Sequence, residues 1–398
     1  MSHYFITLKW LFISGMATLL GACGSSGSSS QLDNCAYTAH PDLSGLYTIP
    51  DSVWQADFQL AIDNELHPEL QSQLEQVANT FLDKAPGMSV AVAIPGEGLW
   101  AIQKGKANTY NDSPVLDDDL FQIASITKTF TAAIIMQLVT EKKLQLSDRI
   151  SRWYPNIPNA EVMTIEHLLR HTSGLMSFDA LPELDSEYHS ADDIIALVAT
   201  KTPLFCPGTQ WAYSNTGYAV LGRIIEIVEG IPLHTVLEQR MTQPLNLNHT
   251  LLRYLDDGIA VVDGHSNGIP VEAPDGYATP YAAGGMASSA EDLITFWHAL
   301  MAAKVVTDDQ LKNMFTPLHP MDQSGQMFYG MGVQAYDVIP GPGLMLGHSG
   351  GITGFSSMVS YIPQDNIYIS VIFNDKEISA AAGLWSLVQA VRAYRSKN

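Results

Sequence analysis

Basic residues are scarce in this 398-residue sequence, in which 20 lysines and arginines stand against 41 aspartates and glutamates. The formal net charge is −21, and a surface this acidic repels a phosphate backbone, which argues against nucleic-acid partners. Long apolar runs are missing after residue 22, so no later segment is expected to span a membrane. Hydrophobic residues still make up 46% of the chain, enough for a large core and two or three structural units.

The first 22 residues are typical of a targeting signal. Lys9 precedes an apolar stretch over residues 10–20, which is too short to span a bilayer. The sequence Leu-Gly-Ala-Cys that ends at Cys23 resembles a bacterial lipobox, and this resemblance implies cleavage before Cys23 and its lipidation. We therefore expect a lipid-anchored protein on the periplasmic side of a bacterial membrane, with residues 23–66 as tether and irregular leader. The alternative is an ordinary secretory signal, which also exports the protein.

Cysteine is also rare, with three in the whole chain. Lipidation of Cys23 would leave Cys35 and Cys206, and export permits them to form a disulfide. Two separate thiols are the alternative, which we disfavour because exposed free thiols fare poorly in an oxidising compartment.

A serine and a lysine three residues apart begin the most apolar part of the chain. Ser125 and Lys128 lie in residues 121–145, which have the apolar spacing of a helix. Positions i and i+3 share a helix face, so hydroxyl and amine are expected to meet at the first turn. A buried amine loses its proton more readily and can take one from the serine. By itself, the pair is better explained as a helix-capping serine beside a solvated lysine.

The order of the predicted elements indicates an α/β (α+β) fold. An amphipathic helix over residues 67–84 is followed by a hairpin of strands at 88–94 and 99–103. The C-terminal part predicts further strands and a closing helix, at residues 330–336, 354–362, 366–373 and 379–394. Between them the chain is mostly helical, with helices predicted at 121–143, 165–170, 191–200, 215–229, 232–241 and 291–303. We expect an antiparallel sheet flanked by N- and C-terminal helices over residues 67–398, with a helical domain inserted at about 130–300.

Two further stretches make the serine-lysine pair specific. Tyr213-Ser-Asn215 stands just before an apolar helix, and His348-Ser-Gly-Gly351 is a glycine-rich stretch near the predicted C-terminal strands. The order Ser-x-x-Lys, Tyr-x-Asn, His-x-Gly resembles the serine β-lactamase and penicillin-binding superfamily, on the branch of class C β-lactamases and D-alanyl-D-alanine carboxypeptidases. That branch also includes esterases and D-amino-acid peptidases. The resemblance covers residues 67–395 and extends to residues 164–175 and 283–293.

The resemblance implies an acyl-enzyme mechanism without a cofactor. Ser125 would be the acylated nucleophile and Lys128 the group that activates it. Tyr213 would shuttle protons, with neighbouring cations keeping its pKa accessible. The N–H groups of Ser125 and Gly351 would form the oxyanion hole.

The resemblance also implies how substrate is held. Asn215 would bond the amide on the substrate's acyl side and hold the lysine in place. His348 would orient the substrate's carboxylate or the hydroxyl of Tyr213, and Ser349 and Gly350 would line the same binding stretch. Class C β-lactamases commonly have lysine at the position of His348, and a histidine grips a carboxylate more weakly.

We therefore expect an exported, monomeric serine hydrolase that is most like a D-alanyl-D-alanine carboxypeptidase or another penicillin-binding hydrolase. The alternatives are a class C-like β-lactamase, a carboxylesterase, a D-amino-acid peptidase and a catalytically silent binding module. The expected substrates are D-Ala-D-Ala peptides, β-lactams or small esters.

Three other patterns resemble known functional motifs. His167 and His171 follow Glu166, but a zincin needs its glutamate between the two histidines, so structural roles are favoured and no metal is expected. Ser349 lies in a Gly-x-Ser-x-Gly pattern, which in an α/β-hydrolase must be followed by a helix rather than by the strand predicted here. The glycine-containing stretch of residues 350–354 is too short and wrongly placed for a dinucleotide-binding loop.

Overall fold

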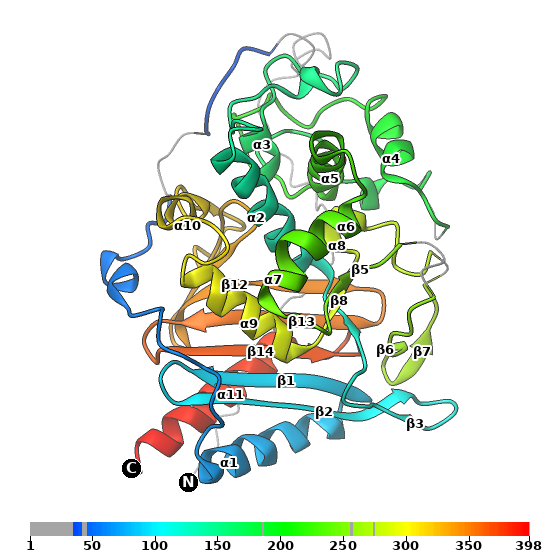
Figure 1. Cartoon of the computed structure of the whole chain (residues 1–398). Helices are drawn as coiled ribbons and strands as arrows, with labels where there is room; N and C mark the ends of the chain where they lie inside the picture. The colour runs from blue at the N-terminus through cyan, green and yellow to red at the C-terminus, as the bar shows by residue number, and fades with distance from the viewer. Residues whose placement is uncertain (1–34, 42–45, 185–186, 255–257, 274, 398) are drawn as a thin grey trace.

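The structure is a computed structural model that describes residues 35–41, 46–184, 187–254, 258–273 and 275–397 (Figure 1). The predicted signal segment and Cys23 lie outside these ranges, so export and lipidation stay predictions. Within the described ranges, no helix combines the length and hydropathy needed to cross a bilayer.

A nine-stranded antiparallel sheet runs through the lower half of the molecule as drawn in Figure 1. Strand β1 pairs with β14 in the register Val90↔Val371, which joins the N-terminal hairpin to the C-terminal strands. From one edge to the other the strands are β3 (Ser113–Pro114), β2 (Gly98–Asn108), β1 (Gly87–Ile94), β14 (Ile367–Phe373), β13 (Phe355–Ile362), β12 (Gly343–Ile352), β11 (Gln334–Val338), β10 (Met327–Tyr329) and β9 (His319–Pro320). The predicted antiparallel sheet of N- and C-terminal strands is confirmed.

The two terminal helices cover one face of this sheet. Helix α1 (Pro68–Asn79) packs against α11 (Ala380–Arg395), below the sheet in Figure 1. Alternate residues of β1, among them Val90 and Val92, share a core with Leu70 and Leu74 of α1. Pro68 suits the first helical position, because the N–H that it lacks has no partner within the helix there. These terminal helices were predicted, although residues 80–83 form a separate 3₁₀ turn.

The helical part of the chain covers the opposite face (Figure 1). Its centre is α2 (Thr127–Thr140), a nearly fully buried helix that contacts α5 (Asn215–Glu229) and α8 (Tyr281–Gly284). Phe130 of α2 stacks on Phe296 of α9 (Ala290–Met301), which lies on the sheet. The other helices are α3 (Ile165–Leu169), α4 (Ala191–Val198), α6 (Leu233–Leu237), α7 (Gln243–Leu245) and α10 (Asp308–Met314).

Two small sheets complete the fold. Strand β8 (Met286–Ser288) lies between β4 (Phe121–Gln122) and β5 (Leu251–Leu252), and β6 (Gly264–Ser266) pairs with β7 (Ile269–Val271). Because β4 includes the first residues of the predicted helix over 121–143, that helix begins only at Thr127.

Other elements also have bounds that differ from the predicted ones. The predicted helix over 232–241 becomes α6 followed by a π-helical turn over Glu238–Thr242. The predicted strand at 330–336 begins only at Gln334, because Gly330 N–H donates to the Val333 carbonyl and Gly332 has a φ of 68°. By contrast, the predicted helix over 215–229 has the bounds of α5, which ends at left-handed Gly230.

The first described residues are tied to the helical part of the chain. Cys35 and Cys206 form a disulfide across 171 residues of sequence, with their Cα atoms 5.5 Å apart. Nearby, His167 Nε2 lies 2.9 Å from the carbonyl oxygen of Thr38, and its other ring nitrogen accepts from Thr164 N–H at the start of α3. His167 thus has a structural role, as the sequence favoured.

Candidate active site

Ser125 lies in a strained turn that connects β4 to α2. Residues Ala124–Ile126 form one 3₁₀ turn, and Ala124 has a φ of 49°, a left-handed conformation that alanine rarely adopts. Ser357 Oγ donates to the carbonyl of Ile123 at 2.9 Å, and a Cβ on Gly350 would collide with that same carbonyl oxygen. The turn is thus pressed against β12 and β13, and Ser125 is the one residue of the turn that is not fully buried.

Lys128 lies directly beneath this serine. Its Nζ donates to Ser125 Oγ at 3.1 Å and to the carbonyl oxygen of Ala283 in α8 at 2.6 Å. The side chain is fully buried. Burial lowers the pKa of Lys128 to about 7, partly opposed by the negative charge of Asp179. A substantial fraction of Lys128 is therefore neutral at neutral pH and able to accept the serine's proton.

Tyr213 approaches the same serine oxygen from another side. Its hydroxyl donates to Ser125 Oγ at 2.9 Å, and its ring centroid is 4.8 Å from Lys128 Nζ. The ring packs on that of His171, whose Nδ1 accepts from Ser214 N–H and so fixes the adjoining backbone. Burial raises the pKa of Tyr213, so the expectation that neighbouring cations keep this pKa accessible is wrong. Lys128 is thus the better proton acceptor, with Tyr213 as a proton donor.

An unpaired strand edge faces this group. Strand β11 pairs with β12 only as far as Gly347, and beyond it β12 pairs with β13 alone. Ser349 N–H points to this open edge, where it donates to the side chain of Gln334. In an antiparallel strand the N–H directions alternate, so the N–H of Gly351 points to the same edge. Gly351 is exposed, and a Cβ there would meet no atom within 4 Å, so this part of the edge is open to solvent.

Asn215 does not hold the lysine, contrary to what the resemblance implied. It is the first residue of α5, and its Nδ2 donates to Asp179 Oδ1 at 3.1 Å while its N–H donates to Ser177 Oγ. The carbonyl of Ala283 holds Lys128 instead. Asp179 was not predicted, because it lies in a short 3₁₀ turn over Phe178–Ala180 with no motif around it.

His348 lies within β12 rather than before it, and its side chain is buried. Its Nδ1 is 2.7 Å from the carbonyl oxygen of Ser349, and its Nε2 is 3.2 Å from the hydroxyl of Tyr329. Burial and the charge of Lys128 lower the pKa of His348 to about 3, so the ring is neutral at neutral pH. Its hydroxyl partner is therefore Tyr329 rather than Tyr213, and it offers a carboxylate no positive charge.

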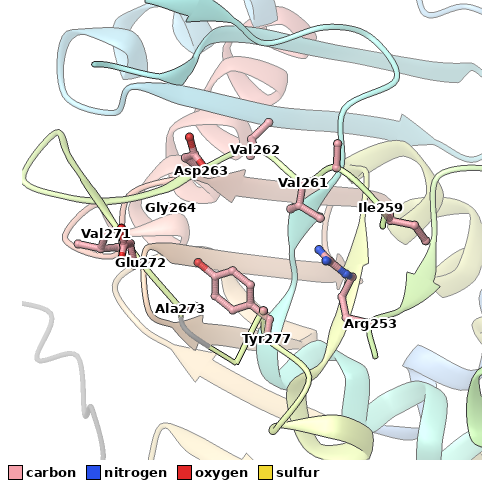
Figure 2. Close-up of a pocket in the computed structure, with 12 residues that line it drawn as sticks. Arg253, Ile259, Val261, Val262, Asp263, Gly264, Val271, Glu272, Ala273 and Tyr277 are labelled. Carbon is pink, nitrogen blue, oxygen red and sulfur yellow. The ribbon is translucent and has the colours of Figure 1, made fainter. Parts of the chain in front are cut away.

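A cavity of about 450 Å³ lies near the turn that follows β12. Figure 2 shows Arg253, Val261 and Tyr277 around this space. The hydroxyl of Tyr277 donates at 3.2 Å to the carbonyl of Thr353, which is two residues beyond Gly351 in the turn between β12 and β13. No motif in the sequence indicates this cavity, whose lining residues come from the segment between β5 and α8.

A lysine and a tyrosine that converge on one serine, beside an open strand edge, define an acylating serine hydrolase. The comparisons with known proteins are more specific: residues 74–392 match the Beta-lactamase family, and the chain belongs to that family. The chain is therefore a serine hydrolase of the penicillin-binding, β-lactamase and esterase kind.

Several relatives illustrate the range of this family. Penicillin-binding protein 4* of Bacillus subtilis is 30% identical over 74% of this chain and 70% of its own length. Esterase EstB of Burkholderia gladioli is 28% identical over 54% of this chain and 66% of its own. Among solved structures, the D-amino acid amidase of Ochrobactrum anthropi, complexed with L-phenylalanine amide, has a TM-score of 0.74 and 25% identity, and covers 82% of this chain and 99% of its own.

Proposed function

We propose that this protein hydrolyses small amides, peptides or esters through an acyl-enzyme on Ser125. The observation that carries the proposal is the convergence of Lys128 Nζ and the Tyr213 hydroxyl on Ser125 Oγ, at 3.1 and 2.9 Å. Together with the open edge at Gly351, these groups supply a nucleophile, a base, a proton donor and an oxyanion site.

Each proposed step conserves atoms and charge. Neutral Lys128 takes the proton of Ser125 while Oγ forms a bond to the substrate's carbonyl carbon, and the N–H groups of Ser125 and Gly351 bind the oxyanion. The C–N or C–O bond then breaks, and the leaving atom receives the proton by way of the Tyr213 hydroxyl. Water attacks the acyl-enzyme with the same groups moving its proton, which releases a carboxylic acid and restores Ser125.

Two substrate classes fit this chemistry. The sequence favours carboxypeptidase-like action on peptides ending in D-Ala-D-Ala, and similarity to a penicillin-binding protein supports it. The neutral, buried state of His348 favours the second class, amides or esters whose leaving group is uncharged, and similarity to an amidase and an esterase agrees with it. Asn215 would bind the substrate's acyl-side amide in either class, and the cavity beside Tyr277 would hold the acyl group.

Labelling with a fluorescent fluorophosphonate and a fluorescent penicillin tests the proposal. We expect fluorophosphonate to label the wild type and Ser125→Ala to remove the label. Ser386→Ala is the matched control, because this partly buried serine lies on α11, on the opposite face of the sheet, and it should keep full labelling. A folded wild type that neither reagent labels would instead indicate a silent binding module.

We also propose that the protein is exported and anchored by a lipid on Cys23, on the strength of the N-terminal sequence. Full-length protein expressed in a bacterium should sediment with membranes, and Cys23→Ser should abolish lipidation. Recovery of both forms in the cytoplasmic fraction would contradict the proposal.

A further inference from the structure

Gln334 occupies the point at which the open edge of β12 begins. It is the first residue of β11, its register partner is Gly347, and its side chain is buried. Its Oε1 accepts the N–H of Ser349 at 2.8 Å, the hydroxyl of Ser349 at 3.1 Å and the hydroxyl of Tyr336. An atom that receives three donors is an amide oxygen and cannot be the amide nitrogen.

The nearby donors of His348 and Tyr329 are also engaged in hydrogen bonds within the protein. The carbonyl oxygen of Ser349 can only accept, so His348 Nδ1 must carry the proton in the bond between them. In the neutral ring Nε2 is then an acceptor, and it accepts a hydrogen bond from the hydroxyl of Tyr329. These neighbours therefore direct their protons at one another rather than at a bound molecule.

This end of the site also has little positive charge. Within the described residues, Lys128 is the one charged group that acts on the pKa of His348, and none acts on that of Tyr336. Proteins bind carboxylates through cations or through several free N–H and O–H donors. A carboxylate placed here would instead meet the oxygen of Gln334 and bonded hydroxyls, and burying it without partners is costly.

The proposed mechanism directs the leaving group of the substrate toward this same end. Tyr213 is the proposed donor to the leaving atom, and its ring meets Tyr329 edge to face at 5.8 Å. Tyr329 in turn bonds to His348. The opposite direction along β12 leads through Gly351 to Thr353 and the cavity of Figure 2, which suits the acyl group.

We propose that Gln334 restricts the site to substrates whose leaving group is uncharged, namely amides and esters that release ammonia, a neutral amine or an alcohol. Peptides that release an amino acid with a free carboxylate are then poor substrates. This inference rests on the proposed acylation of Ser125 and specifies its substrate class; if it is right, the carboxypeptidase prediction is wrong.

A pair of esters that share one acyl group tests the inference. The acetyl esters of para-hydroxybenzoate and of its methyl ester differ in one carboxylate on the leaving group. We expect kcat/KM, divided by each ester's rate with hydroxide, to be about tenfold or more higher for the uncharged leaving group. The ratio should persist at roughly 0.5 M salt, where long-range repulsion by the acidic surface is screened. N-acetyl-D-alanyl-D-alanine and its C-terminal amide provide the same comparison in a peptide.

Two variants link the preference to Gln334. Gln334→Arg supplies a cation, and Gln334→Ala frees both donors of Ser349. Each variant should therefore lower the ratio of the kcat/KM for the uncharged ester to that for the charged ester by about fivefold or more. Gln76→Arg is the matched control, since it adds the same charge at an exposed position of α1, beyond the sheet. Circular dichroism and fluorophosphonate labelling of Ser125 show whether each variant is folded and active.

The outcomes separate this inference from the proposed function. Absence of labelling at Ser125 would reject the acyl-enzyme itself. A labelled wild type that cleaves the charged ester as fast as the neutral one would overturn the inference alone. A ratio that Gln334→Arg and Gln334→Ala leave unchanged would show that Gln334 is not the selecting residue.

Discussion

Lys128 couples the chemistry of the site to pH. It must be neutral to accept the proton of Ser125, and burial lowers its pKa to about 7. We predict that kcat/KM falls about tenfold for each pH unit below 7 and levels off above that value. Tyr213 adds no second rise below pH 9, because burial raises its pKa. A rate profile measured from pH 5 to 9 with a neutral ester tests this, and a flat profile would remove Lys128 from the role of base.

The same residue lowers the stability of the fold. Folding lowers the pKa of Lys128 from 10.5 to about 7, so between these pH values the unfolded chain holds a proton on Lys128 that the folded chain lacks. The free energy of unfolding therefore falls as the pH falls through that window. We predict that Lys128→Met abolishes acylation and raises the free energy of unfolding at pH 7 by a few kcal/mol, since each pKa unit is worth about 1.4 kcal/mol. Urea unfolding should show most of this gain lost near pH 10, and a gain independent of pH would contradict the electrostatic cause.

Residue-scale interactions were the hardest to foresee. The roles of Ser125, Lys128 and Tyr213 follow from a resemblance in their order, and the structure brings these three side chains together. Gln334 and Asp179 stand in no recognisable motif, because their importance comes from what faces them across the site. Burial also determines the protonation state of His348, because it lowers the pKa of the ring. The sequence identifies this histidine as a candidate site residue but does not show that its ring is buried and neutral.

At the scale of elements, two adjacent glycines of β12 differ in what they tolerate. A Cβ on Gly350 would collide with the Ile123 carbonyl beneath Ser125, whereas a Cβ on Gly351 meets open space. We predict that Gly350→Ala costs about 2–4 kcal/mol of stability and strongly reduces labelling of Ser125. Gly351→Ala, the matched control, should change the stability by less than about 1 kcal/mol. Chemical denaturation of both variants measures the difference between their free energies of unfolding. Equal losses of stability would mean that the turn before Ser125 shifts to accommodate the added Cβ.

Elements were predictable where the chain specifies them locally. The bounds of α5 follow from an apolar period, the serine before it and a glycine after it. The turn at Ser125 was not predictable, because Phe121 and Gln122 are extended only through pairing with β8, more than 160 residues later. Likewise, the cavity beside Tyr277 forms only when the segment between β5 and α8 lies against the turn after β12.

At the scale of the whole molecule, a disulfide ties the first described residues to the helical part of the chain. The bond between Cys35 and Cys206 closes a loop across 171 residues, and opening such a loop typically costs about 2–5 kcal/mol. We predict that dithiothreitol lowers the melting temperature of the wild type by several degrees. A double variant, Cys35→Ser with Cys206→Ser, should melt at the lower temperature with or without the reductant. Equal melting of wild type with and without reductant would show that the bond adds no stability.

The pairing of β1 with β14 has a consequence for how this protein is made. The nucleophile is synthesised early, but the strand with Gly351 and the partner of β1 come from the last sixth of the chain. A ribosome-bound or truncated fragment that ends before β12 therefore has Ser125 and no complete site. Long-range pairing of this kind is slow to form. The chain thus stays inactive until synthesis is nearly complete, which suits an enzyme that we expect to leave the cytoplasm before it acts.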